Sequence, residues 1–122
     1  MPGARPSSSV DYEPSAGDLI WTELDPRVGR EQSGRRPAVV VSPLAFWRAS
    51  RFAIVCPITR HVRPFALSVV LPSGLPISGE ILMSHVRSID TMARPILYAG
   101  AAVPVAILAD IRAKLAALLG MS

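Results

Sequence analysis

GDLIWTELDPRVGREQSGRRPAVVVSP, residues 17–43, joins an alternating apolar run, an arginine-rich loop and a second apolar run. Residues 18–24 interleave apolar with polar side chains, and residues 37–42 are rich in β-branched side chains. Both patterns predict β-strands. Between them, an Asp-Pro step and two glycines favour turns that let the chain fold back. The stretch therefore predicts two strands that present a long loop.

This loop is dense in guanidinium groups and contains one internal acid, Glu31. Loops held by a rigid sheet often carry binding and catalytic groups, and arginine forms paired hydrogen bonds with phosphate or carboxylate. A functional anion-binding loop is therefore one interpretation. The other is a solvated hairpin loop in an arginine-rich protein. The four arginines are Arg27, Arg30, Arg35 and Arg36.

Charge is unevenly distributed along the chain. The 122 residues carry a net charge of +4, but residues 27–63 contain eight arginines against Glu31 alone, a local balance of +7. Such an excess is typical of a surface that binds phosphates or an acidic partner. With 50% hydrophobic residues, the chain is long enough for one domain with a modest core.

The rest of the chain predicts four more strands and two helical segments. A short helical turn is expected at residues 44–50. Apolar residues at three- and four-residue spacings predict a C-terminal helix that begins at Pro104 and stops at Gly120. The predicted strands cover residues 52–58, 65–71, 80–83 and 93–99, with a turn within residues 84–90. Strands with long turns and one terminal helix indicate a mainly β, barrel-like fold.

Several classes of protein do not fit this composition. The lone cysteine, Cys56, cannot form an internal disulfide, and no zinc-type Cys/His spacing occurs, so no metal or cofactor is predicted. Residues 1–15 lack an apolar core of the kind found in signal peptides and predict a flexible N-terminal tail before a domain at residues 16–122. No apolar run reaches the roughly 20 residues that span a bilayer. A cytoplasmic protein without a membrane partner is expected.

Three ordered motifs resemble the MazF/PemK family of toxin–antitoxin endoribonuclease toxins, which includes Kid and ChpB. The first comprises GDLIW, the Asp-Pro turn, G-x-EQ-x-G-x-RP and VVVSP. The second, CPIT at residues 56–59, is similar to the family's third-strand P-x-T element. The third, ILMSHVRSID at residues 81–90, is similar to its VxLxxQVRxID segment. The resemblance spans residues 16–120 and implies an SH3-like small barrel with a C-terminal helix, the fold of MazF and CcdB.

The resemblance also implies an activity: metal-independent, sequence-specific cleavage of single-stranded mRNA to 2′,3′-cyclic phosphate and 5′-hydroxyl ends. Arg36 and Thr59 match the family's catalytic pair. Since arginine stays protonated at neutral pH, we assign Arg36 charge stabilisation rather than base catalysis. Glu31, in the EQ step, is either a proton acceptor or a group that orients an arginine; the alternative is a loop carboxylate that pins Arg27 or Arg35.

Further residues are candidate RNA contacts. His85 stands where family members usually carry Gln, and it is either an acid/base or base-reading group or a partly buried histidine bonded to a backbone carbonyl. His61 is either a substrate contact or an ordinary surface histidine. Arg87 is expected to pair with Asp90 or a backbone carbonyl as scaffold. The full set of RNA-binding candidates is Arg27, Arg30, Gln32, Arg35, Arg60, His61 and His85.

The partners implied by the resemblance are single-stranded RNA, a second copy of the chain in a homodimer, and an acidic MazE/PemI-like antitoxin. An arginine-rich surface complements either polyanion. Two other functions fit the same fold: a non-enzymatic, CcdB-like gyrase poison and a catalytically inactive RNA-binding barrel.

Overall fold

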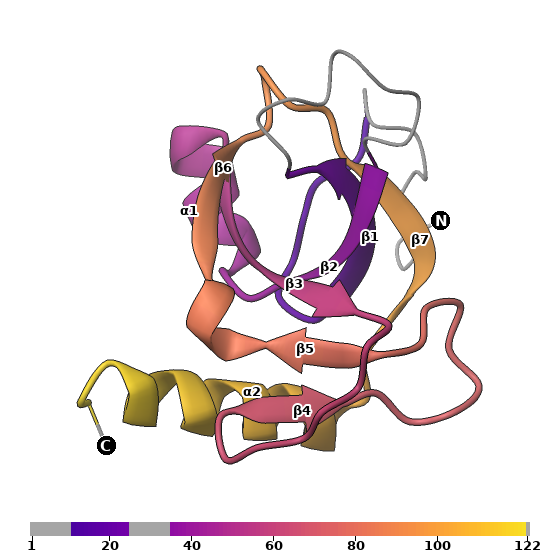
Figure 1. Cartoon of the computed structure of the whole chain (residues 1–122). Helices are drawn as coiled ribbons and strands as arrows, with labels where there is room; N and C mark the ends of the chain where they lie inside the picture. Colours follow the sequence, from indigo (N-terminus) through magenta and orange to yellow (C-terminus); the bar gives the residue numbers. More distant parts are fainter. Residues whose placement is uncertain (1–10, 25–34, 122) are drawn as a thin grey trace.

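A curved antiparallel sheet wraps around the core in the computed structural model, which describes residues 11–24 and 35–121 (Figure 1). The strand order is β4-β5-β3-β2-β1-β7, and β6 also pairs with β3. Within the described residues the elements are β1 Asp18–Glu23, β2 Arg35–Val40, α1 Leu44–Ser50, β3 Phe52–Thr59, β4 Ser68–Val70, β5 Glu80–Leu82, the 3-10 helix η2 Met83–His85, β6 Arg87–Asp90, β7 Leu97–Ala102 and α2 Val105–Leu118.

Consecutive apolar residues in β1 and β2 place apolar side chains on both faces of the sheet. Leu19 pairs with Val39 on one face, and Ile20 pairs with Ala38 on the other. Because successive side chains of a strand point in opposite directions, each strand contributes to two clusters. One cluster lies toward α2 and contains Leu19, Val39, Cys56, Ile58, Val69, Leu71, Ile77, Ile81, Met83, Val103 and Ile111. The other contains Tyr12, Ile20, Leu24, Ala38, Val40, Ala53, Val55, Ile89 and Ile96.

Strand β3 is the central strand and has different partners along its length. Its first half pairs with β6, from Phe52 to Val55, and its end pairs with β5 through Ile58 and Thr59. Its other edge pairs with β2. A strand that changes partner in this way bends the sheet, so the end of β3 emerges between β2 and β5. This is where the candidate site lies.

Helix α2 covers one side of the sheet beside β4 (Figure 1). Ile111 is its fully buried residue, and Lys114 donates a hydrogen bond from Nζ to the Ser68 carbonyl at 2.9 Å. The predicted apolar stripe is therefore largely correct. Leu119, which the pattern included, lies just past the helix and is 61% exposed. Within the described residues, neither α-helix is both long and apolar enough to cross a membrane.

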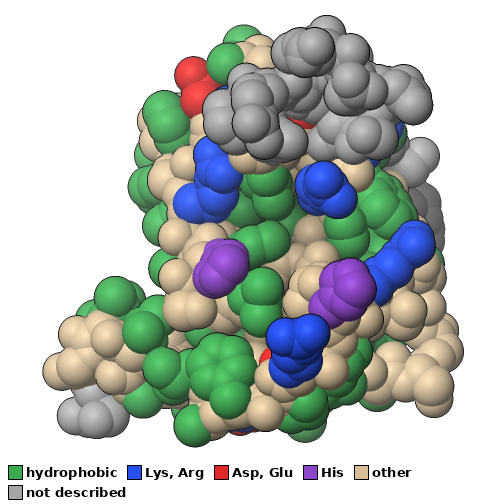
Figure 2. All heavy atoms as spheres, viewed as in Figure 1, with side chains coloured by type: hydrophobic (Ala, Val, Ile, Leu, Met, Phe, Trp, Pro, Cys, Tyr) green, Lys and Arg blue, Asp and Glu red, His purple; other side chains and the backbone are tan. Residues whose placement is uncertain are grey.

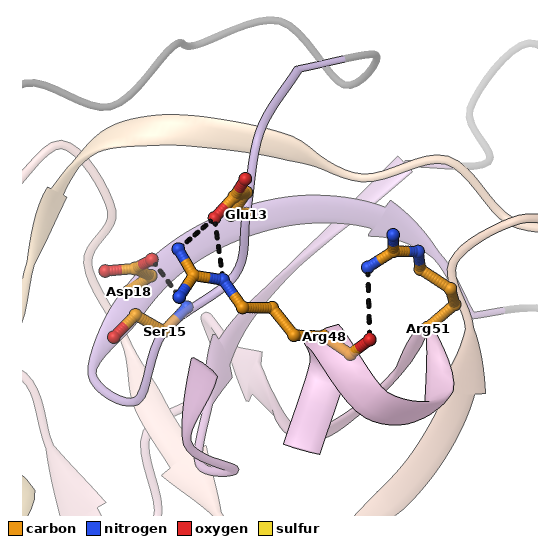
Figure 3. Close-up of polar contacts among 5 residues, drawn as sticks. All are labelled: Glu13, Ser15, Asp18, Arg48 and Arg51. Atoms are coloured by element: carbon orange, nitrogen blue, oxygen red, sulfur yellow. Dashed lines mark hydrogen bonds and ion pairs between the residues drawn. The ribbon is translucent and has the colours of Figure 1, made fainter. Parts of the chain in front are cut away.

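Residues 11–15, which the sequence assigned to a flexible tail, pack onto the body. Tyr12 is 2% exposed, stacks on Tyr98, and donates a hydrogen bond to Asp18 at 2.5 Å. Figure 3 shows Glu13 facing Arg48 of α1, with Oε1 2.9 Å from Nη2. Residues 1–10 lie outside the described part, so the expected tail is not tested there. Within the described part, residues 11–15 are held to the sheet and to α1 by these contacts.

The fold class is confirmed: a mainly β chain with a C-terminal helix, whose curved, open sheet is compatible with a small barrel. The two strands of the opening stretch and the helical segment at residues 44–50 are also confirmed. The turn expected within residues 84–90 is present as η2, but strand β6, which follows it, was not predicted. The expected fourth strand is shorter, only Ser68–Val70, and the last strand lies later, at Leu97–Ala102.

Candidate functional site

Two hollows adjoin at the end of β3. The first, about 300 Å³, has an apolar floor and a cationic rim. It is lined by Leu24, Arg36, Pro57, Ile58, His85 and Arg87. Arg36 reaches it from the start of β2, where it pairs in register with Thr22, and its side chain is exposed. Among the described residues Arg36 has no hydrogen-bond or ion-pair partner. No described residue therefore competes with an anion for its guanidinium.

The second hollow, about 580 Å³, begins at the next residue of β3. It is lined by Thr59, His61, Arg63, Phe65, Glu80 and Leu82. Ile58 thus belongs to the wall of the first hollow and Thr59 to the wall of the second. A polymer bound across both would pass Arg36 and Thr59 in succession.

The hydroxyl of Thr59 is oriented by its own turn. The His61 backbone N–H donates a hydrogen bond to Thr59 Oγ1 at 3.1 Å. A hydroxyl has one proton to donate and two lone pairs. With a lone pair of Oγ1 used by His61, the Thr59 proton can be donated to a ligand oxygen in the hollow.

Positive charge gathers on the face that carries both hollows. Figure 2 shows the two histidines and several Lys or Arg side chains around a patch of apolar side chains. The ion pairs of Glu13 with Arg48 and of Asp110 with Lys114 include none of the lining residues. The described acid in the lining, Glu80, is buried. The exposed part of the site is therefore cationic and suited to a phosphate backbone.

Two arginines hold the end of β1, just before residue 25. Arg87 Nη1 donates to the Leu24 carbonyl at 2.8 Å, and Arg94 Nη1 donates to the Glu23 carbonyl at 2.8 Å. Of the two bonds expected for Arg87, the one to a backbone carbonyl is the one formed. Since Arg87 also lines the first hollow, it connects the scaffold to the site.

The predicted site residues divide into three groups. Arg36, Thr59, His61 and His85 line the two hollows, and His85 is exposed rather than partly buried. Arg35 and Arg60 are exposed on strand β2 and after β3, outside both linings. The remaining four, Arg27, Arg30, Glu31 and Gln32, lie outside the described residues.

Sequence reasoning did not select four lining residues of the second hollow, namely Arg63, Phe65, Glu80 and Leu82. Glu80 pairs with Thr59 in the register of β5 on β3. A signal was available in the sequence, because a glutamate between Gly79 and Ile81 opens a short apolar strand. Its proximity to Thr59 depends on strand pairing, which the local pattern does not give.

No group of three or more His, Cys, Asp or Glu side chains that could hold a metal occurs among the residues the structure describes. The thiol of Cys56 is buried in the core, and burial raises its pKa to about 12. The thiol therefore stays protonated and unreactive at neutral pH. It has a packing role.

Comparison with known proteins gives a consistent result. The family described as PemK-like, MazF-like toxin of type II toxin–antitoxin systems matches residues 15–119. The endoribonuclease toxin MazF of Escherichia coli K12 is 38% identical over 109 residues, covering 89% of this chain and 96% of the relative. The Escherichia coli endoribonuclease PemK is 35% identical over 82 residues, 64% of this chain and 62% of the relative.

Solved structures agree in fold. The crystal structure of MazF from Deinococcus radiodurans superposes with a TM-score of 0.80 at 41% identity, covering 91% of this chain and all of that one. A MazE–MazF complex from the same organism matches with a TM-score of 0.74 at 37% identity, covering 92% of this chain and all of that one.

Proposed function

The chain belongs to the family of PemK-like, MazF-like toxins of type II toxin–antitoxin systems, and we propose that it is an endoribonuclease that cleaves single-stranded mRNA and so inhibits translation. The observation that carries this proposal is the placement of Arg36 and Thr59 in adjoining hollows on one cationic face. Relatives named as endoribonucleases support the activity. The proposed place of action is the cytoplasm, where mRNA is translated.

The proposed reaction uses the RNA's own 2′-hydroxyl and no metal. Its oxygen attacks the adjacent phosphorus, a phosphorane forms, and the bond from phosphorus to the 5′-oxygen breaks. The products are a 2′,3′-cyclic phosphate and a 5′-hydroxyl. The protein must stabilise the added negative charge, accept the 2′ proton and supply a proton to the leaving oxygen.

Arg36 and Thr59 stabilise the charge in this scheme. The guanidinium of Arg36 can bind two phosphate oxygens at once, and it keeps its charge at neutral pH. Thr59 donates its hydroxyl proton to a phosphorane oxygen, because His61 N–H already occupies a lone pair of Oγ1. Two donors that approach from successive hollows fit an extended strand better than a compact ligand.

Proton transfer falls to residues beside Arg36. His85 lines the same hollow as Arg36, and histidine can give or take a proton near neutral pH. Glu31, from the loop before β2, is the other proposed proton acceptor. The remaining loop residues Arg27, Arg30, Gln32 and Arg35, together with Arg60 and His61, are proposed to contact the RNA.

The proposed partners are a second copy of the chain and an acidic antitoxin. The MazE–MazF complexes of Deinococcus radiodurans support a protein antitoxin that resembles MazE. Since RNA and an acidic peptide are both polyanions, they should compete for the cationic face, and both should bind more weakly as salt rises. Light scattering at micromolar concentration tests the homodimer, and a monomer there would contradict it.

The decisive experiment is primer-extension mapping of cuts in a long single-stranded RNA, with EDTA present. Wild-type protein should cut at defined sites, and Arg36→Ala should lose cutting by about 10²–10³-fold, the usual effect of removing one donor to a developing oxyanion. Arg112→Ala, an exposed arginine on α2, is the matched control and should cut normally. No cutting by the wild type would favour a CcdB-like gyrase poison or an inactive RNA-binding barrel.

A further inference from the structure

The second hollow has features that cleavage of the phosphodiester does not require. Its volume, about 580 Å³, is within the range of about 300–1,000 Å³ typical of ligand pockets. Phe65 on its rim is 50% exposed, which is unusual for an aromatic ring in a small domain. Arg63 and His61 stand beside it, both exposed. An exposed aromatic ring in the same hollow as an arginine is the kind of surface on which proteins stack single-stranded nucleobases.

Glu80 forms the buried part of this hollow. Its side chain is 1% exposed, and its Oε1 accepts a hydrogen bond from the Arg63 backbone N–H at 2.7 Å. Its other oxygen, Oε2, is buried and has no hydrogen-bond partner among the described residues. Leaving a buried polar atom without a partner is costly, so proteins rarely do so without a reason. Glu80 lines the hollow, so a shift of the hollow's rim would open Oε2 to a donor on a ligand.

We propose that the second hollow is a nucleobase subsite in which Glu80 Oε2 accepts a hydrogen bond from the exocyclic amino group of a base next to the cleaved phosphate. This inference rests on the proposed ribonuclease function and deepens it. At the position where cytosine carries its N4 amino group, uracil carries the acceptor O4, so a carboxylate oxygen placed there favours cytosine over uracil. Phe65 supplies a stacking surface that does not distinguish bases.

The register of the sheet places this subsite beside the reaction. Thr59 and Glu80 are direct partners across β3 and β5. Glu80, which is proposed to bind the base, therefore lies one strand away from Thr59, which is proposed to donate a hydrogen bond to the phosphate. Oε2 is covered by protein, and a base reaches it only when the rim shifts. The exposed side chain of Arg63 forms part of this rim.

The substitution Glu80→Gln gives a specific test. Arg63 N–H needs an acceptor, so the glutamine oxygen should face it and the amide NH₂ should take the place of Oε2. The change turns an acceptor into a donor with almost no change in shape. Cleavage of a randomised single-stranded RNA pool, read by sequencing the cut ends, should show the preference at one flanking nucleotide shifting from cytosine toward uracil by about tenfold.

Glu13→Gln is the matched control, because Glu13 is a partly exposed acid paired with Arg48 away from the hollow. Its cleavage preference should equal that of the wild type.

A binding measurement on the wild type complements this test. It uses two non-cleavable oligonucleotides that carry 2′-deoxyribose at the cut site and differ only at the flanking position. The oligonucleotide with cytosine there should bind more tightly than the one with uracil. Equal binding at every flanking position would overturn the subsite.

The remaining outcomes separate the two proposals. If Glu80→Gln slows all cuts equally and leaves the preference unchanged, Glu80 only holds the turn at Arg63, and the subsite is refuted while the ribonuclease function stands. If Glu80→Gln loses antitoxin binding with unchanged cleavage preference, the hollow serves a protein side chain instead, and the subsite is again refuted. If wild-type protein cuts no RNA, both proposals fail together.

Discussion

Gly79 lies directly against the backbone of Thr59: a Cβ atom at Gly79 would be 2.3 Å from the Thr59 carbonyl oxygen. The φ angle of Gly79 is +136°, a conformation that side chains with a Cβ rarely adopt. The Gly79 carbonyl also accepts a hydrogen bond from Leu71 N–H at 2.8 Å, which fixes the strand from the other side. The proposed catalytic threonine is therefore positioned by the absence of a side chain next to it.

Gly79→Ala should displace Thr59 and reduce cleavage at least tenfold, mainly through kcat, because the added methyl group meets backbone rather than a flexible side chain. A loss of about 1–3 kcal/mol in the free energy of unfolding should accompany it. Gly74→Ala is the control, since Gly74 also has a positive φ of +93° but nothing lies within 4 Å of its added Cβ. Gly74→Ala should lose some stability and keep its cleavage rate. Normal cleavage by folded Gly79→Ala would refute the positioning role.

Burial of Cys56 predicts a pH dependence of stability. Its pKa is about 12 in the folded chain, against an ordinary value of 9.0. Between these two values the unfolded chain releases a proton that the folded chain keeps, so the free energy of unfolding falls as pH rises, by at most about 1.4 kcal/mol per pH unit. Below about pH 9, the thiol should not affect how the free energy of unfolding changes with pH.

Urea unfolding of the wild type and Cys56→Ala at several pH values from 8 to 10.5 measures this contribution as a difference. The free energies of unfolding of the two proteins should change in parallel below about pH 9, because the other titrating groups are common to both. Above about pH 9 they should converge, because only the wild type loses stability through its thiol. Parallel curves throughout would show that the thiol ionises as readily in the folded chain as in the unfolded one.

Arg87 and Arg94 should have separable effects although both bind carbonyls at the end of β1. Arg87→Met and Arg94→Met each remove a charged donor, at 2.8 Å from its acceptor in both cases, and should each destabilise the fold by about 1–3 kcal/mol. Only Arg87 also lines the hollow that contains Arg36. Arg87→Met should therefore reduce RNA cleavage and weaken its salt dependence, whereas Arg94→Met should change mainly the melting temperature. Equal losses of cleavage would mean that both act only through the position of β1.

The sequence predicted the parts of this fold that local patterns define. Alternation in residues 18–24 and the β-branched run before Ser42 gave two correct strands, and the apolar spacing around Ile111 gave the helix. Strand β6 was missed because it has four residues, of which only Ile89 is buried, and because its status as a strand depends on pairing with β3. Pairing between distant segments leaves little trace in a local pattern.

The residues of the candidate site show the same difference between local motifs and long-range strand pairing. Motif resemblance selected Arg36 and Thr59, since these residues sit within continuous sequence signatures. Glu80 and Gly79 did not stand out, because their importance comes from lying opposite Thr59 across two strands that are about twenty residues apart in the sequence. Contacts of that kind follow from register, and register is set by the whole hydrophobic pattern of the sheet.

The hydroxyl of Thr59 should be necessary for cleavage, and its methyl group should not. Thr59→Val keeps the shape but removes the proton donor and the acceptor that His61 N–H uses at 3.1 Å. It should reduce cleavage about 10²–10³-fold, as loss of a transition-state donor does, with a lowered kcat and a nearly unchanged KM. Thr59→Ser keeps the hydroxyl and should retain cleavage within about tenfold. Single-turnover cleavage of a short labelled RNA at saturating protein measures the chemical step directly. If Thr59→Val and Thr59→Ser cut equally well, the donor to the phosphorane must be another group, and the adjoining hollow of Arg36 would be left as the whole catalytic site.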